Sequence, residues 1–261
     1  MKLAITGKGG VGKSTVAAAL ALLMARRGMR VLAIDADPDA NLASALGISR
    51  KEQQAIVPVS NLRTLIEERT GAKVKQYGQI FKLNPEVSDI ADTYTYTHNG
   101  VSLLVLGAIE QGGGGCACPE NVLIRALVAD LILYKNEAVI MDMEAGIEHL
   151  GRATASGVNM LLVVVEPGQR SLDAAERIRR LAGDIGLRCV KYVANKVVGT
   201  GDEFFIRKAL PGDAVIGVIP YSKALRRIDR DGMSVIDGMS ADMIGLCETM
   251  LDAVLSEGTD Q

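Results

Sequence analysis

The residues best suited to chemistry in this chain form one glycine-rich run near its start. Lys13 and Ser14 end this run and precede a segment rich in Ala and Leu. Glycines let backbone N–H groups wrap a chain of phosphates, and a following helix adds the positive end of its dipole. In such a loop the lysine reaches the β- and γ-phosphates, and the hydroxyl holds Mg²⁺. The pattern predicts a site for the phosphate chain of a nucleotide, made by Gly7, Lys8, Gly9, Gly10, Val11, Gly12, Lys13, Ser14 and Thr15.

Carboxylates stand at the ends of two apolar segments, 30–35 and 137–142. Open α/β sheets bind ligands outside the carboxyl ends of their strands, so both groups should lie near the phosphate loop. Asp142 ends the second segment, where a carboxylate can hold Mg²⁺ through water. Asp37 precedes Pro38, whose ring fixes the turn. The alternative for Asp37 is a turn without chemistry.

Cys116 and Cys118 form a second candidate site. They follow four glycines and precede Pro119, a residue favoured in the first turn of a helix. Two thiols at the start of a helix, whose dipole favours thiolate, suit a soft metal. One chain supplies only two such ligands, so a four-thiolate site needs two chains; Zn²⁺ would take it as a tetrahedron and Ni²⁺ as a square plane. A redox pair and two incidental thiols are the alternatives.

Strands and helices must hold these groups, and apolar runs alternate with helical patterns along the chain. This order, with 48% apolar and only 3% aromatic residues, predicts an α/β fold with a mostly parallel central sheet and helices on both faces. Residues 1–261 should form a single domain, with about 49–100 inserted as a lid or subdomain. Within the insertion we expect an edge strand at 94–99, with a partner surface as the alternative. Strands are expected at 1–6, 30–35, 101–106, 137–142, 159–165, 188–194 and 215–219, and helices at 15–27, 61–69 and 242–255.

Composition and charge argue against two kinds of partner, nucleic acid and membranes. The net charge is −2, and neither a basic stripe nor interleaved aromatic residues are present, which argues against nucleic acid. No apolar run approaches the ~20 residues that span a membrane. The amphipathic segment 242–255 is acidic, so an anionic membrane would repel it. The first residues read as a strand rather than a signal peptide, and we expect a cytoplasmic protein with reduced thiols.

A second lysine in the loop, Lys8, sets the run apart from an ordinary phosphate loop. The pattern K-G-G-x-G-K-S resembles that of the dimeric nucleotide switches that include MinD, ParA, the ArsA ATPase and the nitrogenase iron protein. The resemblance implies a homodimer in which Lys8 reaches the partner's nucleotide, and catalytic roles for Lys8, Lys13 and Asp37, with Asp37 positioning the attacking water. A solvated loop lysine is the alternative.

The same resemblance extends to two further segments. Residues 142–148 are similar to the second switch of the MinD branch, which loss of the γ-phosphate would release. Asn195 would read the adenine edge, with Pro220 and Tyr221 beside the base. A turn residue without a ligand is the alternative for Asn195.

Taken with the C-x-C pair, the motifs K-G-G-V-G-K-S-T, D-A-D-P-D-A-N-L and M-D-M-x-A-G-I-E-H-L resemble CooC-type ATPases over essentially the whole chain. These are nickel-insertion accessory proteins for carbon monoxide dehydrogenase, and the related AcsF serves acetyl-CoA synthase. The resemblance implies ATP-dependent dimerisation, Ni²⁺ or Zn²⁺ at the interface cysteines, and hydrolysis coupled to metal delivery to either client.

Two other functions remain open at this point. One is an electron-transfer ATPase like the nitrogenase iron protein, although that family places its cluster cysteines far apart rather than as C-x-C. The other is a spatial switch of the MinD or ParA kind, against which the acidic C-terminal segment and the lack of a basic face argue.

Overall fold

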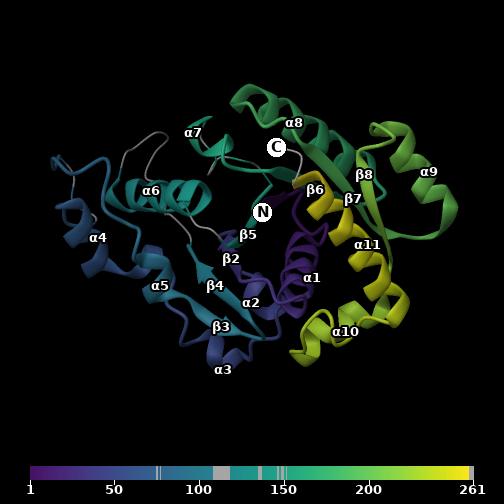
Figure 1. The fold of residues 1–261 in the computed structure, drawn as a ribbon, viewed down its shortest axis with the longest axis horizontal. Helices are drawn as coiled ribbons and strands as arrows, with labels where there is room; N and C mark the ends of the chain where they lie inside the picture. Colours follow the sequence, from purple (N-terminus) through teal and green to yellow (C-terminus); the bar gives the residue numbers. More distant parts are fainter. Residues whose placement is uncertain are drawn as a thin grey trace.

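A computed structural model describes residues 1–74, 76, 78–107, 118–134, 137–145, 147, 150 and 152–258. Strands in this part form one eight-stranded sheet in the order β3-β4-β2-β5-β1-β6-β7-β8, and only the β3–β4 pairing is antiparallel. Figure 1 shows the sheet with helices above and below it. The strands are β1 (Lys2–Thr6), β2 (Val31–Ala36), β3 (Tyr96–His98), β4 (Val101–Val105), β5 (Ala138–Met143), β6 (Met160–Val165), β7 (Val190–Val197) and β8 (Val215–Pro220).

The helices of the described part fall into long covering helices and short pieces of one or two turns. They are α1 (Lys13–Arg26), α2 (Leu42–Ala45), α3 (Arg50–Gln53), the 3-10 turn η1 (Val59–Asn61), α4 (Arg63–Thr70), α5 (Ile90–Tyr94), α6 (Pro119–Tyr134), α7 (Arg152–Ala155), α8 (Gln169–Ile185), α9 (Gly199–Ala209), α10 (Lys223–Asp231) and α11 (Ala241–Gly258).

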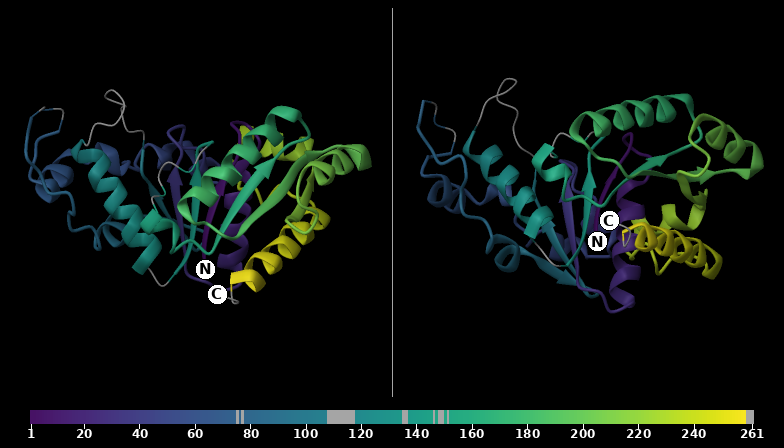
Figure 2. Two further views of the ribbon diagram at one scale, coloured as in Figure 1. Left: turned by 90° about the horizontal axis from the view of Figure 1, so that it is seen from above. Right: turned by 45° about the horizontal axis from the view of Figure 1, so that its top comes forward.

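Two hydrophobic cores lie on opposite faces of the sheet. In β2, Leu32 and Ile34 belong to one core, whereas Val31 and Ala33 belong to the other. Side chains alternate across a strand, so this division separates the faces. Helices α4, α6 and α8 cover one face and α1 and α11 the other, as the two views of Figure 2 also show. Both faces are therefore sealed, which leaves the strand ends as the place for chemistry.

The expected α/β fold is confirmed, and every expected strand is present within about two residues of its predicted bounds except β7, which ends three residues later than predicted. The first helix was expected at 15–27 but begins at Lys13, because Gly12 already turns the chain with a left-handed φ of 99°. The edge strand expected at 94–99 is β3, the antiparallel end of the sheet.

The segment 49–100 packs onto the domain through apolar side chains. Val59, Ile66 and Ile90 are buried in the same core as the inner strands. A capping box starts α3, with the Ser49 hydroxyl and the Glu52 carboxylate accepting from each other's backbone N–H. These contacts give the segment a fixed seat, whereas its role as a lid stays a prediction.

Candidate functional site

The glycine-rich loop joins β1 to α1 at the carboxyl edge of the sheet. Gly7, Gly10 and Gly12 all have positive φ, at 149°, 81° and 99°. A Cβ on Gly7 would lie 2.3 Å from the Val164 carbonyl oxygen, and one on Gly12 would lie 2.3 Å from Asn195 Nδ2. Glycine is thus required at both ends of the loop by backbone conformation and by neighbours.

Lys13 opens α1 and is nearly buried. Its Nζ lies 3.4 Å from Asp37 Oδ2, and both side chains are close to full burial. Asp37 follows β2, and its Oδ1 accepts the backbone N–H of Asp39 at 3.0 Å. The structure therefore joins two predicted catalytic residues from different strand ends, and a charged phosphate reaching Lys13 would meet Asp37 as well.

Asp142 lies on β5 directly beside β1 and β2, in register with Ile5 and Asp35. Neither oxygen of its buried carboxylate has a hydrogen-bond partner within the described residues. Burial raises the pKa of Asp142 to about 6, while the neighbouring Ser14 hydroxyl and Lys13 act in the opposite direction. A buried carboxylate without partners is costly, and a hard cation with oxygen ligands would relieve that cost. Asp142 and Ser14 therefore fit the predicted Mg²⁺ site.

Asp35 builds the turn that carries Asp37. Its two oxygens accept the backbone N–H groups of Asp37 at 3.2 Å and Leu42 at 3.0 Å. Burial and the nearby Asp142 raise the pKa of Asp35 to about 7, and the two hydrogen bonds limit the rise. Asp35 thus has a structural role that shapes the segment after β2.

Asn195 was expected to read the adenine edge, and its position reveals a second task. It lies buried within β7, and its Nδ2 donates to the Val11 carbonyl oxygen at 2.8 Å. Tyr221, the predicted neighbour of the base, is 45% exposed just after Pro220 at the end of β8. The amide of Asn195 therefore holds the phosphate loop, and its contact with adenine stays a prediction.

Sequence reasoning missed two residues at this edge, Glu166 and Lys196. Lys196 has a left-handed φ of 60°, and its Nζ donates to the Gly10 carbonyl oxygen. Glu166 follows β6, and its carboxylate lies 3.1 Å from Lys196 Nζ and 3.8 Å from Lys8 Nζ. The available signal was a charged residue at or just past the carboxyl end of a buried strand, the same signal that identified Asp37 and Asp142.

Of the predicted C-x-C site, Cys116 lies outside the described residues. Cys118 precedes α6, and its carbonyl oxygen accepts the Val122 N–H at 3.1 Å, the first hydrogen bond of the helix. Burial raises the pKa of the Cys118 thiol despite a hydrogen bond from the Asn121 backbone. The helix dipole was expected to favour thiolate, and in this arrangement burial outweighs it.

Two absences concern only the part of the chain that the structure describes. No group of three or more His, Cys, Asp or Glu side chains able to hold a metal ion is found there. Within the same residues, no helix has the length and apolar character needed to cross a membrane. In the predicted second switch, Gly146 and Glu148 lie outside the described ranges.

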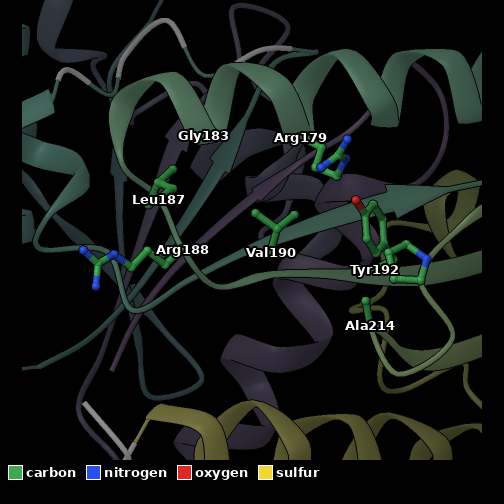
Figure 3. A pocket seen from close by; sticks show the side chains of 8 residues that line it. Arg179, Gly183, Leu187, Arg188, Val190, Tyr192 and Ala214 are labelled. Atoms are coloured by element: carbon green, nitrogen blue, oxygen red, sulfur yellow. The ribbon is translucent and has the colours of Figure 1, made fainter.

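A cavity of about 280 Å³ lies at the amino ends of the strands, between the end of α8 and the starts of β7 and β8. Figure 3 shows the Tyr192 hydroxyl pointing toward Arg179 across it. Arg179 already pairs with Glu176, at 2.9 Å on both of its bonded nitrogens. The cavity is therefore separate from the phosphate loop, which lies at the carboxyl ends of the strands.

Known proteins related in sequence cover most of this chain. The family model for the CobQ/CobB/MinD/ParA nucleotide binding domain matches residues 2–235. The carbon monoxide dehydrogenase accessory protein CooC of Rhodospirillum rubrum is 44% identical over 91% of this chain and 90% of its own. An uncharacterized ATP-binding protein of Methanocaldococcus jannaschii is 46% identical over 85% of this chain and 86% of its own.

Solved structures agree on the fold. MinD of Aquifex aeolicus, in complex with MinC, superposes with a TM-score of 0.67 over 97% of this chain and 95% of its own, at 22% identity. MinD of Pyrococcus horikoshii complexed with Mg-ADP gives a TM-score of 0.67 at 17% identity, covering 97% of this chain and 94% of its own.

Proposed function

Because the chain belongs to the CobQ/CobB/MinD/ParA nucleotide-binding family and is an ATPase that uses Mg²⁺, we propose that it couples ATP hydrolysis to nickel insertion in a client metalloenzyme. The main support for this proposal is the 44% identity to CooC, in a chain that also has the C-x-C pair. The name of that relative points to carbon monoxide dehydrogenase as the client; the acetyl-CoA synthase alternative is kept.

The nucleotide half of the proposal rests on the loop and on Asp142. Lys13 would bind the β- and γ-phosphates, and Ser14 and the unpartnered Asp142 would hold Mg²⁺, which neutralises phosphate charge when bound. Asp37, now 3.4 Å from Lys13, would orient water once phosphate takes its place beside the lysine. Lys8 would act on the nucleotide of a second chain.

The metal half of the proposal rests on residue chemistry and stoichiometry. Cys116 and Cys118 supply two soft ligands per chain, so Ni²⁺ or Zn²⁺ as cargo would join two chains through four thiolates. A single domain over residues 1–261, with about 49–100 inserted as a lid or subdomain, completes the proposal. The fixed apolar seat of Val59 and Ile66 supports the single domain.

Metal content and mass in solution test this proposal together. The protein is loaded anaerobically with Ni²⁺ or Zn²⁺, desalted, and analysed for metal and for mass, beside a Cys118→Ala variant and a Cys247→Ala control. Cys247 is fully buried in α11, on the face of the sheet opposite to the one that α6 covers. We expect about half an equivalent per chain in a dimer, lost in Cys118→Ala and retained in the control.

Other results would contradict the metal proposal in distinguishable ways. Metal retained in Cys118→Ala would place the ligands elsewhere in the chain. Iron with acid-labile sulfide would favour the electron-transfer alternative. No metal in the wild-type protein would leave an ATPase whose C-x-C pair has another purpose.

A further inference from the structure

Glu166 is a carboxylate set between two lysines at the phosphate loop. It follows β6, next to β7 in the sheet, and its backbone N–H is fixed by the Ser171 hydroxyl at 3.0 Å. Its Oε2 lies 3.1 Å from Lys196 Nζ, and its Oε1 lies 3.8 Å from Lys8 Nζ. One side chain therefore contacts both a lysine of the loop and a lysine that holds the loop.

The two ion pairs differ in strength. Lys196 also donates to the Gly10 carbonyl oxygen, and its N–H donates to Asn195 Oδ1 at 2.9 Å, so it is anchored at three points. The Lys8 and Lys196 side chains are both 40% exposed, but the Lys8 pair, at 3.8 Å, stands at the long limit for an ion pair. An exposed pair at that distance contributes little to stability. Glu166 is thus held firmly by Lys196 and holds Lys8 weakly.

This asymmetry suits a group that must be released. In the proposed function Lys8 reaches the nucleotide of a second chain, and to do so it must leave Glu166. We infer that Glu166 is a positioning residue that keeps Lys8 against its own chain until a phosphate chain on the partner competes for it. The inference rests on the proposed dimer. It makes Glu166, a residue outside the glycine-rich loop, the group that opposes dimerisation.

Self-association driven by a non-hydrolysable ATP analogue with Mg²⁺ tests the inference. Sedimentation across a range of protein concentrations gives the dimer dissociation constant for the wild type, Glu166→Gln, Lys8→Ala and the double variant. We expect Glu166→Gln to lower this constant about threefold, since it removes one weak ion pair from the monomer. In the Lys8→Ala background the same change should alter nothing.

The matched control is Glu203→Gln on α9, where the carboxylate pairs with Arg207 at 2.7 Å on the surface. It makes the same chemical change and should leave the dissociation constant as in the wild type. A Glu166→Gln protein that dimerises like the wild type overturns the inference. So does a gain that persists in the Lys8→Ala background, because Glu166 would then act through Lys196 or by charge alone.

Failure of the proposed function gives a different pattern. A wild type that stays monomeric with the analogue at every concentration removes the dimer itself, and the inference falls with it. Dimerisation of the wild type with no dependence on Glu166 removes this inference alone.

Discussion

The hydrogen bond from Asn195 to the phosphate loop gives a prediction that separates loop support from base reading. Asn195→Ala removes the donor and leaves the buried Val11 carbonyl oxygen without a partner. Leaving a buried acceptor unsatisfied costs about 1–3 kcal/mol. If half of that cost, about 0.5–1.5 kcal/mol, falls on the loop's phosphate-binding conformation, phosphate affinity should fall about 2- to 13-fold.

The assay compares ATP, GTP and tripolyphosphate by calorimetry in the presence of Mg²⁺. Because Asn195 acts on the loop, we expect Asn195→Ala to weaken all three ligands by a similar factor. The unfolding temperature should fall by about 2–4 °C for each kcal/mol of stability that is lost. Tripolyphosphate has no base, so its affinity reports the loop alone.

A matched asparagine provides the control. The Asn159 side-chain oxygen accepts the Lys2 backbone N–H at 2.7 Å, at the opposite edge of the sheet. Asn159→Ala should lower the unfolding temperature and leave tripolyphosphate affinity unchanged. Unchanged tripolyphosphate affinity in Asn195→Ala, together with a selective loss of ATP, would refute loop support and favour contact with adenine.

Four further predictions concern the same edge of the sheet and the cysteines. Lys8→Ala should abolish hydrolysis while the monomer still binds ADP, as measured by turnover and titration; full turnover would contradict a role in trans. Asp142→Asn should remove the Mg²⁺ dependence of nucleotide binding without lowering the unfolding temperature at pH 8, because it replaces a carboxylate whose pKa burial raises to about 6. Without nucleotide, the stability of the fold should fall as the pH rises from about 4 to 7. Burial raises the pKa of Asp35 to about 7, so over this range the folded chain keeps a proton that the unfolded chain has released. Thermal unfolding across this range measures the slope, and a slope of zero would count against a buried, protonated Asp35. Cys118→Ala should leave ATP affinity unchanged, since Cys118 precedes α6 rather than lying in the loop, and a loss of ATP binding would place α6 in the nucleotide site.

Much of the fold follows from local sequence. The runs that became β1, β5 and β6 are apolar and continuous because both faces of the sheet are covered. The phosphate loop was recognisable because glycine is needed where φ is positive, as at Gly12. These features depend on residues close together in the chain, so pattern and spacing are sufficient to predict them.

The side-chain contacts that the sequence did not predict depend on which strands become neighbours in the sheet. Glu166 and Lys196 are 30 positions apart, and they meet because β6 and β7 pair in parallel. Asn195 lies within a register irregularity between Ala194 and Val197, which apolar periodicity cannot reveal. The sequence pointed to Asn195 as a nucleotide-site residue but not to Glu166 or Lys196, whose contact depends on the order of the strands.

The ion pair between Lys13 and Asp37 has a consequence for how occupancy is sensed. The lysine already has an anionic partner, so an arriving phosphate exchanges one partner for another instead of filling a bare charge. The net attraction for phosphate is then a difference between two similar interactions, which allows the product to leave. Displacement of the Asp37 carboxylate would also move the segment after β2, because Asp37 Oδ1 accepts the hydrogen bond of the Asp39 N–H. Phosphate binding and the conformation of the segment after β2 are thus linked through one carboxylate, that of Asp37.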